Sequence, residues 1–185
     1  MTNVTVFGSG KMGSAIGSVF SSGGASVDHI TTSTPDASVT GDIVVLAVPY
    51  PAVSDIVAKY GEQLAGKVVV DVTNPIDYKT FGFFEPADGS VTAEIANLLP
   101  DSKVVKGFNT TFFHTLADAG QGAVVLVAGD DDDAKASVVS AIKAGGFGAV
   151  DAGALTTARE LEAFAKLQIQ LAMGGKIGRF AVVAA

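Results

Sequence analysis

The sequence VTVFGSGKMG occupies residues 4–13. Its apolar start predicts a short strand that leads directly into GSGKMG at 8–13, and an Ala-containing helical pattern follows. A Gly-x-Gly-x-x-Gly loop between a strand and a helix is the context in which this motif binds a dinucleotide. Gly8 permits the tight turn, Gly10 lets a pyrophosphate approach the backbone, and Gly13 lets the helix pack on the strand. The free N–H groups at the helix start then face the pyrophosphate, whereas the competing interpretation is a purely structural glycine turn.

Short β-branched runs alternate with helical stretches along the rest of the chain, which predicts an α/β fold. Several runs are continuously apolar, as in strands that are buried on both faces. We therefore expect a Rossmann-type, doubly wound, mostly parallel sheet with a small helical C-terminal part. The predicted strands cover 4–7, 27–31, 43–48, 68–72, 104–108, 124–128 and 148–150, and the predicted helices cover 12–21, 52–63, 91–98, 131–143 and 157–173.

The organisation of the chain is simple. A length of 185 residues fits one domain, and no Ser/Gly or Pro tract divides it. We expect a single nucleotide-binding domain over 1–185, with 151–185 as a short helical extension. The stretch 32–42 is too short for a full second helix and third strand, which predicts a trimmed Rossmann sheet on that side.

Composition excludes several kinds of chemistry. The chain has no Cys and 2 His, so we expect no disulfide, no thiolate or His-rich metal site and no Cys nucleophile. With 19 Asp+Glu against 12 Lys+Arg, a nucleic acid or an anionic membrane is disfavoured as a partner. The acidic run at 130–133 is better explained as a helix N-terminal cap than as a metal site. The N-terminus lacks a cationic signal start and no apolar run reaches the ~20 residues of a membrane helix, which predicts a soluble cytoplasmic protein.

The end of the second predicted strand bears on which dinucleotide is bound. An NAD site usually carries a carboxylate about 20 residues after the glycine loop, where it binds the ribose. The corresponding positions hold hydroxyl residues instead: Thr31, Thr32, Ser33 and Thr34. A carboxylate would repel a 2′-phosphate and hydroxyls can donate to it, so NADP is favoured over NAD. No Arg supplies a phosphate clamp, and an ordinary polar turn, or Asp36 as a ribose ligand, stays open.

Further segments point to a family. They read DIVVLAVPY at 42–50, KVVVDVTNP at 67–75, VKGFNT at 105–110, VDAGAL at 150–155 and ARELE at 158–162. Together with the glycine loop, this ordered set resembles the NADP-dependent oxidoreductases of coenzyme F420, a deazaflavin, over nearly the whole chain. The same domain occurs in membrane ferric reductases of the STEAP type. The resemblance implies NADP in the glycine loop and hydride transfer between its nicotinamide and a flavin-like or deazaflavin ring.

The resemblance also implies positions for the ligands. It places the pyrophosphate at Gly8, Ser9, Gly10, Lys11 and Met12, the 2′-phosphate at Thr32 and Ser33, the middle of the dinucleotide at Ala47, Val48 and Pro49, the nicotinamide at Asn74 and Pro75, and the hydride acceptor at Asn109. The chain departs from the family where members typically carry Ser-Arg in place of Thr32-Ser33. No side chain here is diagnostic of a deazaflavin, so the acceptor stays open among a deazaflavin, a flavin and another small electron acceptor.

Bound rings carry out hydride transfer with little help from side chains, so no catalytic residue is assigned with certainty. Asn109, His114 and Tyr50 are candidates for the acceptor site. His114 would bond an acceptor carbonyl or simply pack beside two aromatic residues, and Tyr50 would shape the nicotinamide edge or pack between two prolines. Lys106 is structural or solvated, or else holds an anionic ring, and His29 is most simply structural.

Two other functions remain open. One is a non-enzymatic NADP-binding sensor or regulatory domain, and the other is a small imine or keto reductase related to pyrroline-carboxylate reductases. The latter normally needs a long helical domain after residue ~160, where this chain has room for about one helix. The last predicted helix, 157–173, has apolar residues on more than one face, which predicts that it packs against a second subunit in a homodimer.

Overall fold

The computed structural model describes residues 2–34, 36–77, 79–117, 122–178 and 181–183, and it is built around one large sheet. The strands of this sheet are β1 (Asn3–Phe7), β2 (Ser26–Ile30), β3 (Ile43–Leu46), β4 (Val68–Asp71), β7 (Lys103–Lys106), β8 (Ala123–Gly129), β9 (Gly148–Gly153) and β10 (Val182–Val183). The neighbouring strands β2, β1, β3, β4 and β7 all run parallel. β8 then runs antiparallel to β7, while β9 pairs parallel and β10 antiparallel with β8. The prediction of a mostly parallel α/β sheet is confirmed.

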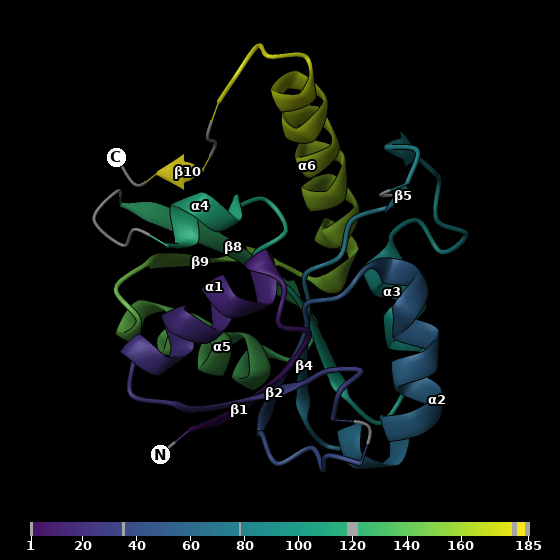
Figure 1. The fold of residues 1–185 in the computed structure, drawn as a ribbon, viewed down its shortest axis with the longest axis vertical. Coiled ribbons are helices and arrows are strands. Elements are labelled where there is room, and N and C mark those ends of the chain that lie inside the picture. The colour runs from purple at the N-terminus through teal and green to yellow at the C-terminus, as the bar shows by residue number, and fades with distance from the viewer. Residues whose placement is uncertain (1, 35, 78, 118–121, 179–180, 184–185) are drawn as a thin grey trace.

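Helices cover both faces of the sheet (Figure 1). Those of the described residues are α1 (Lys11–Ser22), α2 (Val53–Leu64), α3 (Val91–Leu98), α4 (Phe113–Leu116), α5 (Asp132–Ala144) and α6 (Ala158–Met173). Figure 1 shows α1 and α5 on one face, α2 and α3 on the other, and α6 standing above the carboxyl ends of the parallel strands.

Two apolar cores follow from this arrangement. Val45 of β3 packs in the core with α1 and α5, whereas its neighbours Val44 and Leu46 pack in the core with α2 and α3. Successive side chains of a strand point to opposite faces, so a strand that is covered on both sides is apolar at every position. This is why β3 has no alternating pattern.

The sheet is shortened beside β2. Between Ile30 and Ile43 the described residues form no helix or strand, and β3 pairs directly with β1. The expected trimming of the Rossmann sheet is therefore present. Within the described residues, no helix combines the length and the apolar character that crossing a bilayer requires.

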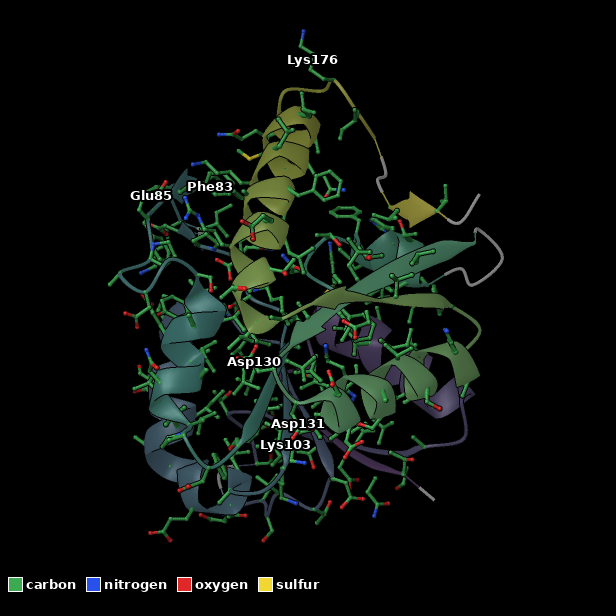
Figure 2. The ribbon with its side chains drawn as sticks, turned by 180° about the vertical axis from the view of Figure 1, so that it is seen from behind. Phe83, Glu85, Lys103, Asp130, Asp131 and Lys176 are labelled. Carbon is green, nitrogen blue, oxygen red and sulfur yellow. The ribbon has the colours of Figure 1, made fainter. Side chains whose placement is uncertain are left out.

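Four small elements among the described residues were not predicted. Strands β5 (Ile76–Asp77) and β6 (Gly82–Phe83) form a separate hairpin, α4 is a single turn, and β10 returns the chain after α6 to the edge of β8. Figure 2 shows Phe83 and Glu85 beside α6, where Lys166 lies 5.4 Å from the Phe83 ring centroid and 3.8 Å from the Glu85 carboxylate. Elements of two to four residues have too little length for a detectable hydrophobic period.

Candidate functional site

The glycine loop joins β1 to α1, and its glycines are required for different reasons. Gly8 has a φ of 103°, and a Cβ there would lie 2.5 Å from the carbonyl oxygen of Ala47. A Cβ on Gly13 would lie 2.4 Å from the Gly8 carbonyl oxygen. In contrast, a Cβ on Gly10 has no described heavy atom within 4 Å. Gly8 and Gly13 thus permit close packing of the protein, whereas Gly10 borders open space at the start of α1, where backbone N–H groups lack helical partners.

The second strand supports this loop. The backbone N–H of Gly8 donates to the carbonyl oxygen of Ile30 at 2.9 Å. The Nδ1 atom of His29 lies 2.9 Å from the Gly8 carbonyl oxygen, and because a carbonyl only accepts, Nδ1 carries the hydrogen. His29 therefore holds the glycine loop against the end of β2.

The hydroxyl residues after β2 form a compact turn beside the glycine loop. Thr31 Oγ1 lies 2.7 Å from Ser33 Oγ, and the Thr31 N–H donates to Thr34 Oγ1 at 2.8 Å. Thr32 and Ser33 are exposed, so their polar groups are open to a ligand. Asp28, farther back on β2, accepts from Thr40 Oγ1 at 3.3 Å instead.

A cleft of about 590 Å³ opens at the carboxyl ends of the parallel strands, within the range usual for ligand sites. It brings together nine of the residues singled out from the sequence: Gly10, Lys11, Met12, Gly13, Ala47, Val48, Pro49, Asn74 and Asn109. Gly8, Ser9, Pro75 and the hydroxyl turn adjoin these segments but do not line the cleft. A larger hollow of about 820 Å³ lies at the opposite, amino ends of the strands. We assign the site to the first cleft because open α/β sheets bind ligands at the carboxyl ends.

Two polar residues of the cleft retain unused hydrogen-bonding capacity. Asn109 Nδ2 donates to Asn74 Oδ1 at 3.0 Å and to the Leu161 carbonyl oxygen at 3.1 Å. Asn109 Oδ1 and Thr111 Oγ1 are buried and have no hydrogen-bond partner among the described residues. Because buried polar atoms are nearly always satisfied, these two atoms are suited to bind polar groups of a ligand.

The far wall of the cleft comes from α6, the last helix of the chain. Ile169, Ala172 and Met173 face the glycine loop across the cleft, together with Phe81 from the β5–β6 hairpin. Among the described residues that line the cleft as a whole, only Lys11 of the glycine loop carries an ionisable side chain. An apolar cleft with few ionisable groups suits chemistry that bound rings perform.

Tyr50 and His114, two of the three acceptor-site candidates, do not line the cleft. The Tyr50 hydroxyl donates to Glu94 Oε2, and the pKa of Tyr50 is raised by burial first and by the Glu94 hydrogen bond and charge second. His114 is exposed on α4, with its ring centroid 4.0 Å from that of Phe113.

Lys106 is fully buried, and its ammonium group binds two carboxylates. They belong to Asp71 of β4 and Glu162 of α6, each 2.9 Å away. The segment 158–162 was singled out from the sequence, but the pairing of Glu162 with Lys106 was not, because the two residues lie 56 positions apart.

Comparison with known proteins matches this chain to proteins that are named as reductases. Residues 25–75 match the family described as NADP oxidoreductase coenzyme F420-dependent. The F420-dependent NADP reductase of Methanocaldococcus jannaschii is 34% identical over 155 residues, covering 80% of this chain and 70% of that protein. The metalloreductase STEAP3 of Rattus norvegicus is 36% identical over 104 residues, which is 55% of this chain and 20% of that protein.

Solved structures share the fold along the whole chain. A protein of Arthrobacter sp. fb24, solved as a candidate F420-dependent NADP reductase, superposes with a TM-score of 0.85 at 24% identity and full coverage of both chains. An imine reductase of Bacillus cereus has a TM-score of 0.67 at 18% identity, covering 95% of this chain and 62% of that one. At these identities the likeness concerns the fold alone.

Proposed function

Because the chain belongs to the family of coenzyme F420-dependent NADP oxidoreductases, we propose that it transfers hydride between NADP(H) and a deazaflavin or flavin-like ring. One observation carries the proposal: a single cleft runs from the glycine loop past Asn74 and Asn109 to the apolar wall of α6. Such a cleft accommodates a nicotinamide ring that is anchored by its pyrophosphate, with a second ring beside it.

The residues present fit both ligands. The open space at Gly10 and the free N–H groups of α1 receive the pyrophosphate, and the hydroxyls of Thr31, Thr32 and Ser33 donate to the 2′-phosphate. The unpartnered Asn109 Oδ1 and Thr111 Oγ1 accept from N–H groups of the bound rings.

When bound, the nicotinamide and the acceptor ring would supply the redox chemistry, a transfer of hydride (two electrons and one proton) with a second proton from solvent. The protein orients the two rings, and the side chains of Ile169, Ala172 and Met173 exclude water from between them.

The test is anaerobic oxidation of NADPH by the purified chain, followed as loss of reduced-nicotinamide absorbance with coenzyme F420, FMN or a cyclic imine as acceptor. We expect turnover with the deazaflavin or the flavin, and slower turnover with NADH. Tight NADPH binding without oxidation by any acceptor would support a sensor, and turnover on the imine alone would support an imine reductase.

The proposal extends to the assembly. We propose that residues 1–185 act as one nucleotide-binding domain, since both cores pack on one sheet. We also propose a homodimer formed through α6, which exposes Phe164, Leu167 and Leu171. A cytoplasmic location stays a prediction from the sequence, which cell fractionation would test.

A further inference from the structure

A buried cluster of charged residues lies directly behind the cleft. Asp71 ends β4, Lys106 ends β7, and the two are register partners. Lys106 Nζ donates to Asp71 Oδ2 at 2.9 Å, to Glu162 Oε1 at 2.9 Å and to the Thr73 carbonyl oxygen at 2.5 Å. An ammonium group has three donors, so all of them are used inside the protein and none is left for a ligand.

Glu162 extends this cluster to two helices. It lies near the start of α6, and its carboxylate accepts from the backbone N–H groups of Val91 and Thr92 at 3.1 and 3.3 Å. These groups begin α3, where a helix favours negative charge. The negative charge of Glu162 is thereby compensated. The cluster also joins strands β4 and β7 to helices α3 and α6 at one point.

The two asparagines of the cleft follow directly from the cluster. Asn74 lies three residues after Asp71, and Asn109 lies three residues after Lys106. Thr73, next to Asn74, donates from its N–H and its hydroxyl to Asp71 Oδ1 at 2.8 and 2.7 Å. Asn109 Nδ2 donates to the carbonyl oxygen of Leu161, the residue before Glu162. The cluster thus fixes the backbone on each side of the Asn74–Asn109 pair.

We propose that the Lys106–Asp71–Glu162 cluster is a positioning device for the hydride transfer proposed above. It touches no ligand and acts through the Asn74–Asn109 pair and through α6, whose far end forms the apolar wall of the cleft. Burying three charges costs free energy, and apolar side chains of similar volume in their place often make a fold equally stable or more stable. What the charged cluster adds is a fixed geometry, and hydride transfer is sensitive to displacements of about 1 Å.

The test compares three variants with the full wild-type chain. Lys106→Met removes the central charge, and Glu162→Gln keeps the shape of the side chain but removes one charge. Lys135→Met is a matched control, because Lys135 is 7% exposed and pairs with Asp132 and Asp151 at 3.1 and 2.9 Å, and it does not line the cleft. Circular dichroism establishes whether each variant folds. If Lys106→Met does not fold, Glu162→Gln tests the proposal in its place.

We expect Lys106→Met and Glu162→Gln to lower the single-turnover rate of NADPH oxidation about tenfold to a hundredfold, with the Kd of NADPH little changed. Lys135→Met should lower the melting temperature and leave the rate unchanged. Equal rates in all folded variants would overturn the proposal, because a merely structural cluster affects only stability.

A second readout does not depend on turnover. The Asn109 side-chain amide donates two hydrogen bonds, so its NMR signals should shift and exchange faster in Lys106→Met and Glu162→Gln, but not in Lys135→Met. An unchanged Asn109 amide would refute the positioning role even if no acceptor is reduced. Absence of turnover in the wild-type chain would instead refute only the proposed function.

Discussion

Single residues determine how much space the glycine loop leaves for a ligand. Gly8 and Gly13 face backbone oxygens, whereas Gly10 faces open space. Gly8 and Gly13 are therefore required by the packing of the protein, whereas Gly10 leaves space for a ligand, in line with the three roles that the motif predicts.

This difference leads to a prediction for Gly10→Ala. The added methyl group meets no protein atom but enters the space of the pyrophosphate, so the fold should be kept while NADPH binds about tenfold more weakly, or about 1.4 kcal/mol. Fluorescence titration with NADPH and thermal denaturation measure the two effects. Gly61→Ala is the matched control, since its Cβ would meet only Val57 Cγ1 at 3.9 Å in α2, and it should bind NADPH normally. Normal NADPH binding by Gly10→Ala would contradict the assignment of the pyrophosphate site.

The hydroxyl turn leads to a second prediction at this scale. Ser33 is exposed beside the glycine loop, and an Arg at this position would add a bidentate phosphate contact. Ser33→Arg should strengthen NADPH binding relative to NADH, and Ser33→Ala should weaken it. The measurement is the ratio of the Kd of NADH to the Kd of NADPH in each variant. If this ratio is the same in Ser33→Arg and Ser33→Ala, the 2′-phosphate binds elsewhere.

At the scale of elements, the acidic run before α5 acts as the predicted helix cap. Asp131 Oδ1 accepts from the Ala134 N–H at 2.8 Å, and Lys103 lies 3.0 Å from its other oxygen (Figure 2). Asp130 instead accepts from the Leu155 N–H at 2.8 Å, across the loop that precedes α6. Asp131 thus caps the start of α5, and its neighbour Asp130 holds the loop that leads into α6.

Asp131→Ala should lower the melting temperature at neutral pH, because the first turn of α5 loses its acceptor. The Ala134 hydrogen bond and then Lys103 hold the pKa of Asp131 below its usual value. A carboxyl group whose pKa is lowered by folding stabilises the protein above its unfolded pKa, about 3.9, and this contribution is lost as the pH falls through the folded pKa.

The difference in melting temperature between wild type and Asp131→Ala should therefore be constant above about pH 4 and shrink progressively as the pH falls below that value. Asp133→Ala, which removes an exposed acidic residue of the same turn but keeps the cap, should cause a smaller loss. A difference that is independent of pH would contradict an ionised cap.

At the scale of the whole molecule, α6 projects above the sheet, with one side on the cleft and another side exposed (Figure 1). Leu167 is 52% exposed and lies one turn from Phe164 and Leu171. If this stripe is the dimer interface, Leu167→Glu should give the mass of one chain where the wild type gives two, measured by light scattering after gel filtration. Leu98→Glu on α3 is the matched control, since Leu98 is 50% exposed, and it should not change the mass. A wild-type chain that is monomeric would refute the dimer.

The sequence by itself determined the parts of this protein that depend on local pattern. Residue type and spacing predict the glycine motif, the apolar strands and the five longer helices. Side chains repeat every 2.0 residues in a strand and every 3.6 residues in a helix, so these elements leave a pattern in the sequence. The cap at Asp131 and the shortened sheet beside β2 belong to the same class, as does the resemblance to the F420-dependent family.

Only the tertiary structure decided which distant residues meet. In the structure, α6 forms the far wall of the cleft, and Tyr50 and His114 do not line the cleft. Lys106 is buried between Asp71 and Glu162. Glu162 and Lys106 share no local pattern, and their contact exists because a helix near the end of the chain packs over the carboxyl ends of two central strands. Contacts of this kind depend on packing in three dimensions, which the spacing of residues along the chain does not encode.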